Sequence, residues 1–136
     1  MIRHILHILF VFLTALVAVL LCGAKPSALE FESREYDFGT IADSHEPVTH
    51  EYRFVNTLDE PVAVLSVSTG CGCTRPQYPI EPVKAGAKGV IKITFLPQGQ
   101  RGEISKTIRV RYRAATARRS ATVNLRLQGS VVPDKK

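Results

Sequence analysis

The feature that most constrains this chain is an alternation of apolar and polar side chains, in short segments, after residue 28. In the segment 48–55, Tyr52 and Phe54 fall on one side of an extended chain, while Glu51 and Arg53 fall on the other. An extended chain points successive side chains to opposite faces of a sheet. No later segment has the 3.6-residue periodicity of a helix. The pattern therefore indicates β-strands that each bury one face.

About seven such segments follow one another, separated by turns that contain Gly, Pro or Asn. Strands are expected at 29–38 (as two brief pieces), 48–55, 62–68, 90–96, 104–112 and 122–132. The segment Thr69–Pro76 and the stretch 79–86 are expected to be loops because Gly or Pro recurs in them. This succession predicts an all-β, antiparallel, immunoglobulin-like β-sandwich that forms a single domain over residues 25–136.

Residues 1–24 have the organisation of a secretory signal peptide, which predicts an N-terminal signal helix before the sandwich. Arg3 gives a positive start, and the fourteen residues 8–21 are apolar apart from Thr14. Small residues then permit a cut after Ala24. A retained membrane anchor is the alternative, although the run is shorter than the roughly 18 apolar residues of a spanning helix. In both cases we expect an extracytoplasmic location, in the periplasm or cell envelope.

Cys22 gives the end of this segment another interpretation. Lipoprotein signals place a small residue directly before the lipidated cysteine, whereas this chain has Leu21 there. Acyl chains on Cys22 would tether the domain to a membrane without a spanning helix. The residues leave cleavage, anchoring and lipidation open. Membrane contact is expected only through an uncleaved signal or a lipid anchor.

The formal net charge of +6 is distributed unevenly. Residues 25–60 hold nine acids and three bases, while residues 101–126 hold eight bases and one acid. Arg109, Arg111 and Arg113 alternate with apolar residues, so they face one way and form a candidate contact strand for phosphate, lipid head groups or an acidic partner. The alternative for the row is a solvated face, or a deterrent to edge pairing. For the two stretches as a whole, acidic and basic strands are expected to be neighbours that neutralise each other. Nucleic acid is not an expected partner of an exported domain.

Several short motifs occur in an order that resembles a known family. They are Phe38-Gly39-x-Ile41, Phe54-x-Asn56, Cys71-Gly72-Cys73-Thr74-x-Pro76, a Pro82/Gly86 turn, Gly102 and Leu127-x-Gly129. The set looks like the bacterial family catalogued as domain of unknown function 1573, which is similar to Hydin-type and PapD-like immunoglobulin sandwiches. The chain departs from that family's pattern at Ala85-Gly86 and at Tyr112-Arg113. The resemblance implies the fold but no settled activity.

Cys71 and Cys73 are the chemically notable pair. Two thiolates one residue apart could hold a soft ion such as Cu(I), and Arg75 would favour the thiolate form. Thiol–disulfide exchange is a second chemistry open to them. The structural alternative is a local disulfide, or half-buried cysteines, in an oxidising compartment. The sequence leaves the bonded, free and metal-bound states open.

Two polar residues are expected to have structural roles. His50 lies on the apolar face beside Tyr52, so it is expected to pack rather than to ligate. Asn56 precedes a turn-rich segment that ends at Pro61, and its side chain is expected to support that turn.

The sequence contains no Ser-His-Asp arrangement, no HExxH motif, no phosphate loop and no dinucleotide fingerprint. We therefore expect no enzyme activity and no cofactor. The predicted function is that of an exported, non-catalytic domain that binds an unknown protein or another envelope component. The alternative is a thiol-redox or copper-handling protein that acts through the loop of Cys71 and Cys73.

Overall fold

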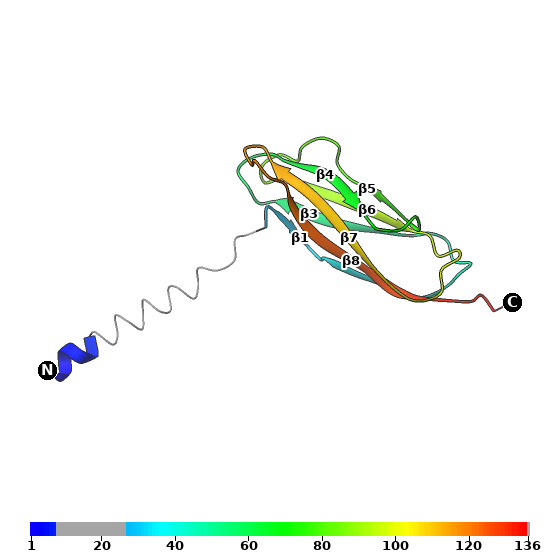
Figure 1. The fold of residues 1–136 in the computed structure, drawn as a ribbon, viewed down its shortest axis with the longest axis horizontal. Coiled ribbons are helices and arrows are strands. Elements are labelled where there is room, and N and C mark those ends of the chain that lie inside the picture. The colour runs from blue at the N-terminus through cyan, green and yellow to red at the C-terminus, as the bar shows by residue number, and fades with distance from the viewer. Residues whose placement is uncertain (8–26, 136) are drawn as a thin grey trace.

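The computed structural model describes residues 1–7 and 27–135. Residues 2–7 form a short helix, and two β-sheets pack face to face over the remaining described residues (Figure 1). The apolar run, Cys22 and the cut predicted after Ala24 lie outside the described residues. Within the described ranges, no helix has both the length and the apolar character that crossing a membrane would require.

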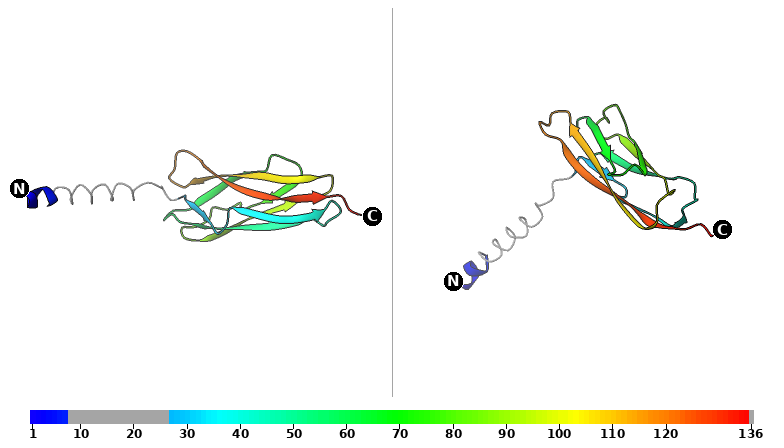
Figure 2. Two further views of the ribbon diagram at one scale, coloured as in Figure 1. Left: turned by 90° about the horizontal axis from the view of Figure 1, so that it is seen from below. Right: turned by 45° about the vertical axis from the view of Figure 1, so that its right-hand side comes forward.

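Eight strands make up the two sheets. They are β1 (Leu29–Phe31), β2 (Glu35–Ala42), β3 (Val48–Asn56), β4 (Val62–Ser68), β5 (Thr74–Gln77), β6 (Lys88–Phe95), β7 (Gly102–Ala114) and β8 (Ala121–Val132). The first sheet has the order β1-β3-β6-β5, and the second has the order β2-β8-β7-β4. Figure 2 shows the two layers from two further directions. The predicted immunoglobulin-like sandwich is confirmed, with one strand more than expected and one parallel pair.

The prediction of a loop over Thr69–Pro76 is wrong for its second half, where β5 pairs with β6. Thr74 is buried opposite Phe95, and the N–H of Leu96 donates to the carbonyl of Cys73 at 2.8 Å. A four-residue strand that contains a proline has no apolar alternation to reveal it. It forms because β6 offers an open edge, and an edge strand tolerates a residue without an N–H.

The parallel pair arises where the chain changes sheet between β1 and β2. The N–H of Glu32 still donates to the carbonyl of Arg53 in the first sheet, at 3.0 Å. The carbonyl of Arg34 then accepts from the N–H of Arg126 in the second sheet, at 2.7 Å. Because the chain crosses without reversing direction, β2 runs parallel to β8.

The core lies between the sheets and takes its residues from the inward side of the predicted alternations. The largest fully buried side chains are Tyr52, Phe54, Phe95, Leu29, Ile91, Ile93, Ile108, Leu125 and Leu127. Fully burying an apolar side chain of this size stabilises the fold by about 1.5–3 kcal/mol. A single continuous core therefore holds the two sheets together.

His50 packs at the margin of this core. Its ring stacks on Tyr36 with 3.8 Å between ring centroids, and it meets the edge of Tyr52 at 4.6 Å. Burial lowers the pKa of His50, and the neighbouring Glu51 carboxylate opposes that shift. The folded chain therefore favours the neutral imidazole more than the unfolded chain does.

We expect the free energy of unfolding to fall as the pH drops below the ordinary histidine pKa of 6.5, because the unfolded chain then binds the proton more readily. Above that pH the contribution is fully present. Urea unfolding between about pH 5.5 and 8 measures the slope. His50→Gln is expected to flatten it. An unchanged slope in His50→Gln would contradict this assignment.

The sandwich has two distinct ends. The β4–β5 loop and the C-terminus lie at one end, which we call the cysteine end. The β7–β8 turn and the start of β1 lie at the other (Figure 1). The β4–β5 loop and the β7–β8 turn therefore belong to two separate surfaces.

Candidate functional site

The predicted cysteine loop joins β4 to β5 and so crosses from one sheet to the other. Gly70, with a φ of 71°, turns the chain directly after β4 in a conformation that glycine adopts easily. Cys71 and Cys73 are joined by a disulfide. The hydroxyls of Thr69 and Thr74 both donate to the carbonyl of Cys71, at 3.3 and 3.5 Å. The disulfide thus lies in a turn that is held by hydrogen bonds from the residues on both sides of it.

Of the three states that the sequence left open, the structure has the disulfide. A bonded sulfur is not a thiolate, which is the form that binds a soft metal ion. Across residues 1–7 and 27–135, no group of three or more His, Cys, Asp or Glu side chains could hold a metal ion. Arg75 lies exposed on β5, opposite Thr94. The chemistry open to the loop in this state is thiol–disulfide exchange.

Removing this disulfide is expected to cost little stability. The bond joins residues only two apart, and the chain-entropy relation for so short a loop gives about 1.5 kcal/mol. A Cys71→Ser/Cys73→Ser variant should therefore unfold cooperatively in urea, with a free energy of unfolding lower by about 1–2 kcal/mol. A reductant should lower the free energy of unfolding of the parent by the same amount and leave that of the variant unchanged. Loss of the cooperative transition would show instead that the bond holds the fold together.

Arg109, Arg111 and Arg113 share the exposed face of the second sheet, as their alternation predicts. Their cross-strand partners are Ser68, Ser66 and Ala63 on β4, and Asn124 and Thr122 on β8. None of these partners is acidic, and no ion pair of the three arginines occurs in the described part of the chain. The acids Glu35 and Asp37 lie on β2, beyond β8. The expected neutralisation between neighbouring strands occurs outside this row, where Arg101 forms an ion pair with Asp43 at 3.8 Å and Glu35 lies opposite Arg126.

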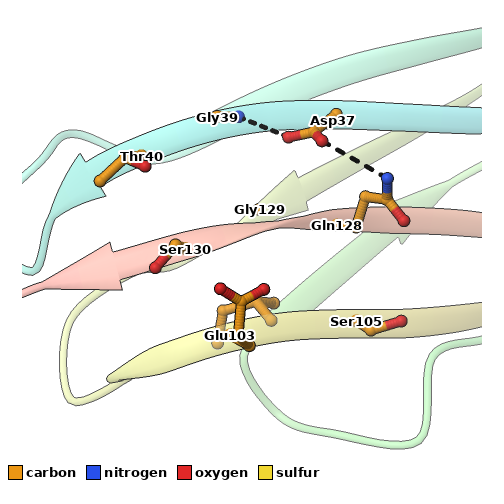
Figure 3. Close-up of a pocket in the computed structure, with 9 residues that line it drawn as sticks. Asp37, Gly39, Thr40, Glu103, Ser105, Gln128, Gly129 and Ser130 are labelled. Atoms are coloured by element: carbon orange, nitrogen blue, oxygen red, sulfur yellow. Dashed lines mark hydrogen bonds between the residues drawn. The ribbon is translucent and has the colours of Figure 1, made fainter.

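A polar hollow of about 350 Å³ lies on the same face, nearer the cysteine end (Figure 3). Asp37 and Glu103 line it from β2 and β7. The Asp37 carboxylate accepts from the N–H of Gly39 at 2.7 Å and from the Nε2 of Gln128 at 3.4 Å. These bonds support the bulge of β2, which lies between Asp37 and Thr40. The role of Asp37 here is therefore structural.

Two further hollows open beside β4, and both reach Ala63. One, of about 460 Å³, is lined by Pro61, Pro82, Lys84 and Arg113 among others. The other, of about 630 Å³, is lined by Leu65, Pro76, Tyr78 and Ile80 among others. We call these two hollows and the outer edge of β4 between them the β4 groove. It combines apolar walls with two cations at one end.

Sequence reasoning missed the apolar wall of the β4 groove. Ile80 is 94% exposed and lies two residues after Tyr78 in a connection that contains proline. The one sequence feature that could have indicated this exposed apolar surface is a large apolar residue outside any alternating segment. Leu65 is exposed and lies at the bulge of β4, between Val64 and Ser66. A bulge of this kind cannot be located from the alternation alone.

The domain matches one protein family in sequence and several solved structures in fold. The family described as "Protein of unknown function (DUF1573)" matches residues 29–131. No curated protein matches the chain in sequence. Among solved structures, the ASH/PapD-like domain 7 of human CEP192 has a TM-score of 0.68 at 18% identity, covering 84% of this chain and 93% of that one.

Two further solved structures have the same fold. A protein of unknown function from Porphyromonas gingivalis W83 has a TM-score of 0.62 at 18% identity, covering 79% of this chain and 50% of that one. The YadV chaperone has a TM-score of 0.58 at 13% identity, covering 80% of this chain and 53% of that one. The chain thus spans about half the length of each. At these identities the likeness is one of fold alone.

Proposed function

The chain belongs to the family "Protein of unknown function (DUF1573)", and on that premise we propose that it is an exported, non-catalytic domain that binds a macromolecular partner at the cell envelope. The observation that carries the proposal is the row of Arg109, Arg111 and Arg113. Alternate residues of a strand lie roughly 7 Å apart, so three like charges stand close together with no acid beside them. Such a face is favourable when a partner supplies the opposite charge.

Two features support export. The residues 1–24 have the order of a secretion signal, with an apolar run followed by small residues. The disulfide of Cys71 and Cys73 is the second feature, because disulfides persist in the periplasm and other oxidising compartments but are rare in the cytosol.

The surroundings of the histidines support a non-catalytic role. The Nδ1 of His45 lies 2.6 Å from the carbonyl of Glu46, and the ring of His50 contacts Tyr36 and Tyr52. A histidine that acts as a general base must lie within hydrogen-bond reach of the group it deprotonates. Among the described residues, no hydrogen bond joins either ring to another side chain.

The test expresses the full chain with a C-terminal tag in a bacterium that carries it, followed by fractionation and chemical cross-linking. We expect the chain in the extracytoplasmic fraction, cross-linked to a second macromolecule, with an N-terminus after Ala24 or a lipid on Cys22. Replacing Arg109, Arg111 and Arg113 by serine should lower the cross-linked yield.

The matched control replaces three other exposed arginines, Arg118, Arg119 and Arg126, by serine, and it should keep the yield. A cytoplasmic chain with residues 1–24 intact would contradict export. A full yield from the variant of the arginine row would contradict its role in binding.

The disulfide favours a second candidate function, which is thiol–disulfide exchange through Cys71 and Cys73; copper handling would require the reduced pair. Thiol titration of the extracted chain shows whether the pair is bonded in the cell. Titration of the reduced chain with Cu(I) against a competing chelator, beside Cys73→Ser, measures metal uptake. If the reduced chain takes up no Cu(I) and the bond does not exchange with glutathione, this candidate is discarded.

A further inference from the structure

We propose that the β4 groove receives an extended segment of a partner protein in which acidic and apolar side chains alternate, and that this segment pairs with β4 as an added strand. The inference rests on the proposed function and names the chemistry of the partner. Adding a strand to an exposed sheet edge is a common way for a β-domain to bind a peptide.

The first step is that β4 is the least protected sheet edge. The edge strands are β1, β2, β4 and β5. Charged residues or proline occur in three of them, namely Glu30 in β1, Glu35 and Asp37 in β2, and Arg75 and Pro76 in β5. Charges, prolines and bulges are what usually prevent an edge from pairing with another chain. The seven residues of β4 include no charge and no proline, so the bulge between Val64 and Ser66 is the one such feature within the strand.

The second step is that the edge of β4 is open past its first residue. Val62 exchanges two backbone hydrogen bonds with Val83, at 2.9 and 2.8 Å, on the side away from β7. Alternate residues of an antiparallel strand direct their N–H and C=O groups to the same side, so those of Val64 also point outward. Among the described residues, no strand pairs with this side beyond Val62.

The third step is charge. Ser68, Ser66 and Ala63 are the cross-strand partners of Arg109, Arg111 and Arg113. Because these β4 residues are small, the arginine side chains can extend over β4 toward a strand about 4.8 Å beyond it. Side chains on one face of that strand recur at every second residue. Acidic residues at alternate positions would therefore meet the row of arginines.

The fourth step is the apolar wall. The side chains between the acidic positions would face the hollow lined by Leu65, Tyr78 and Ile80. Outside the N-terminal helix, the large exposed apolar side chains in the described chain are Leu65, Ile80, Val90 and Val132, and two of these four line this hollow. Apolar residues of the partner would cover them. Together with the open edge, this favours a peptide over a lipid surface, which has no backbone to pair.

The test uses the chain as it is purified from cells that express the whole gene. The probe is a short, end-capped peptide in which glutamate alternates with valine. One control peptide has lysine in place of glutamate, and another has the same composition with its glutamates grouped together. We expect the alternating peptide to bind, the lysine peptide not to bind, and the grouped peptide to bind about tenfold more weakly. Amide hydrogen exchange at Val64 should slow in the complex.

The peptide affinities of single variants show separately what the arginine charges and the apolar contacts contribute to binding. Arg111→Ser should weaken the affinity about threefold, whereas Arg126→Ser, which removes an exposed charge from β8 on the same face, should not change it. Ile80→Ser should weaken it about fivefold, whereas Val90→Ser, at an exposed apolar side chain on β6, should not.

Four results would overturn the inference. They are equal binding of the three peptides, an equal effect of Arg111→Ser and Arg126→Ser, self-association of the chain through β4 that excludes the peptide, and binding to phosphatidylglycerol vesicles but to none of the peptides. If any of these occurs while envelope cross-linking still depends on the arginine row, the proposed function stands and only the binding of a strand in the β4 groove is disproved. If cross-linking also no longer depends on the arginine row, the proposed function is disproved as well.

Discussion

An Asn56→Asp variant is expected to lose about 4–5 kcal/mol of its free energy of unfolding at neutral pH, which would unfold much of a marginally stable domain. Asn56 ends β3 and is fully buried. Its Nδ2 donates to the carbonyls of Glu60, Val83 and Lys84, at 2.8, 3.0 and 3.1 Å. Its Oδ1 accepts from the N–H of Leu58 at 3.0 Å. A carboxylate would present negative charge to three carbonyl oxygens.

Urea unfolding of three variants separates charge from lost hydrogen bonds. Asn56→Ala, which leaves the carbonyls unpaired without adding a charge, should lose about 2–4 kcal/mol. Asn124→Asp, at an exposed position of β8, should remain within about 0.5 kcal/mol of the parent. Asn56→Asp should regain part of its stability at acid pH, because the protonated carboxyl can donate. A loss below about 1 kcal/mol at neutral pH would show that these bonds do not hold the loops.

A Gly89→Ala variant is expected to lose about 3 kcal/mol. Gly89 lies directly opposite Phe54 on the neighbouring strand, and a Cβ there would clash with the Cζ of that ring. Phe54 is buried and packs against Phe31, with 5.3 Å between ring centroids, so the ring cannot swing away. The matched control is Gly72→Ala, where nothing lies within 4 Å of an added Cβ.

A double-mutant cycle checks the cause of this loss. Phe54→Leu shortens the side chain opposite Gly89, so Gly89→Ala should cost at least about 1 kcal/mol less in that background than in the parent. The free energies of unfolding of the four chains give the coupling. If Gly89→Ala costs no more than Gly72→Ala, or if the costs in the two backgrounds are equal, the proposed close contact is not the cause.

Alternation alone was sufficient to predict the buried faces of β3, β7 and β8. Tyr52 and Phe54 on β3, and Ile108 and Val110 on β7, face the core as the period of two requires. The order of strands within each sheet, the crossing between β1 and β2, and the existence of β5 were not predictable in this way. They depend on which edges meet after the chain has folded, and a short strand such as β5 has too few residues to show a period.

The same limit applies to the candidate site. The common face of Arg109, Arg111 and Arg113 follows from their spacing, but the absence of acids beside them depends on β4 and β8 being their neighbours. The state of Cys71 and Cys73 could not be chosen from their spacing either. The burial of Val67, three residues after Val64, depends on the bulge between them, which shifts the alternation by one residue.

The most direct test of partner binding along β4 is photo-cross-linking inside the cell. A photoreactive amino acid is placed in the full chain at Ser66 on β4 or, as the matched position on the same face, at Asn124 on β8. We predict a covalent adduct with a second protein from Ser66, its loss when Arg109, Arg111 and Arg113 are replaced by serine, and no adduct from Asn124. Equal adducts from both positions, or an adduct from Asn124 alone, would contradict the account.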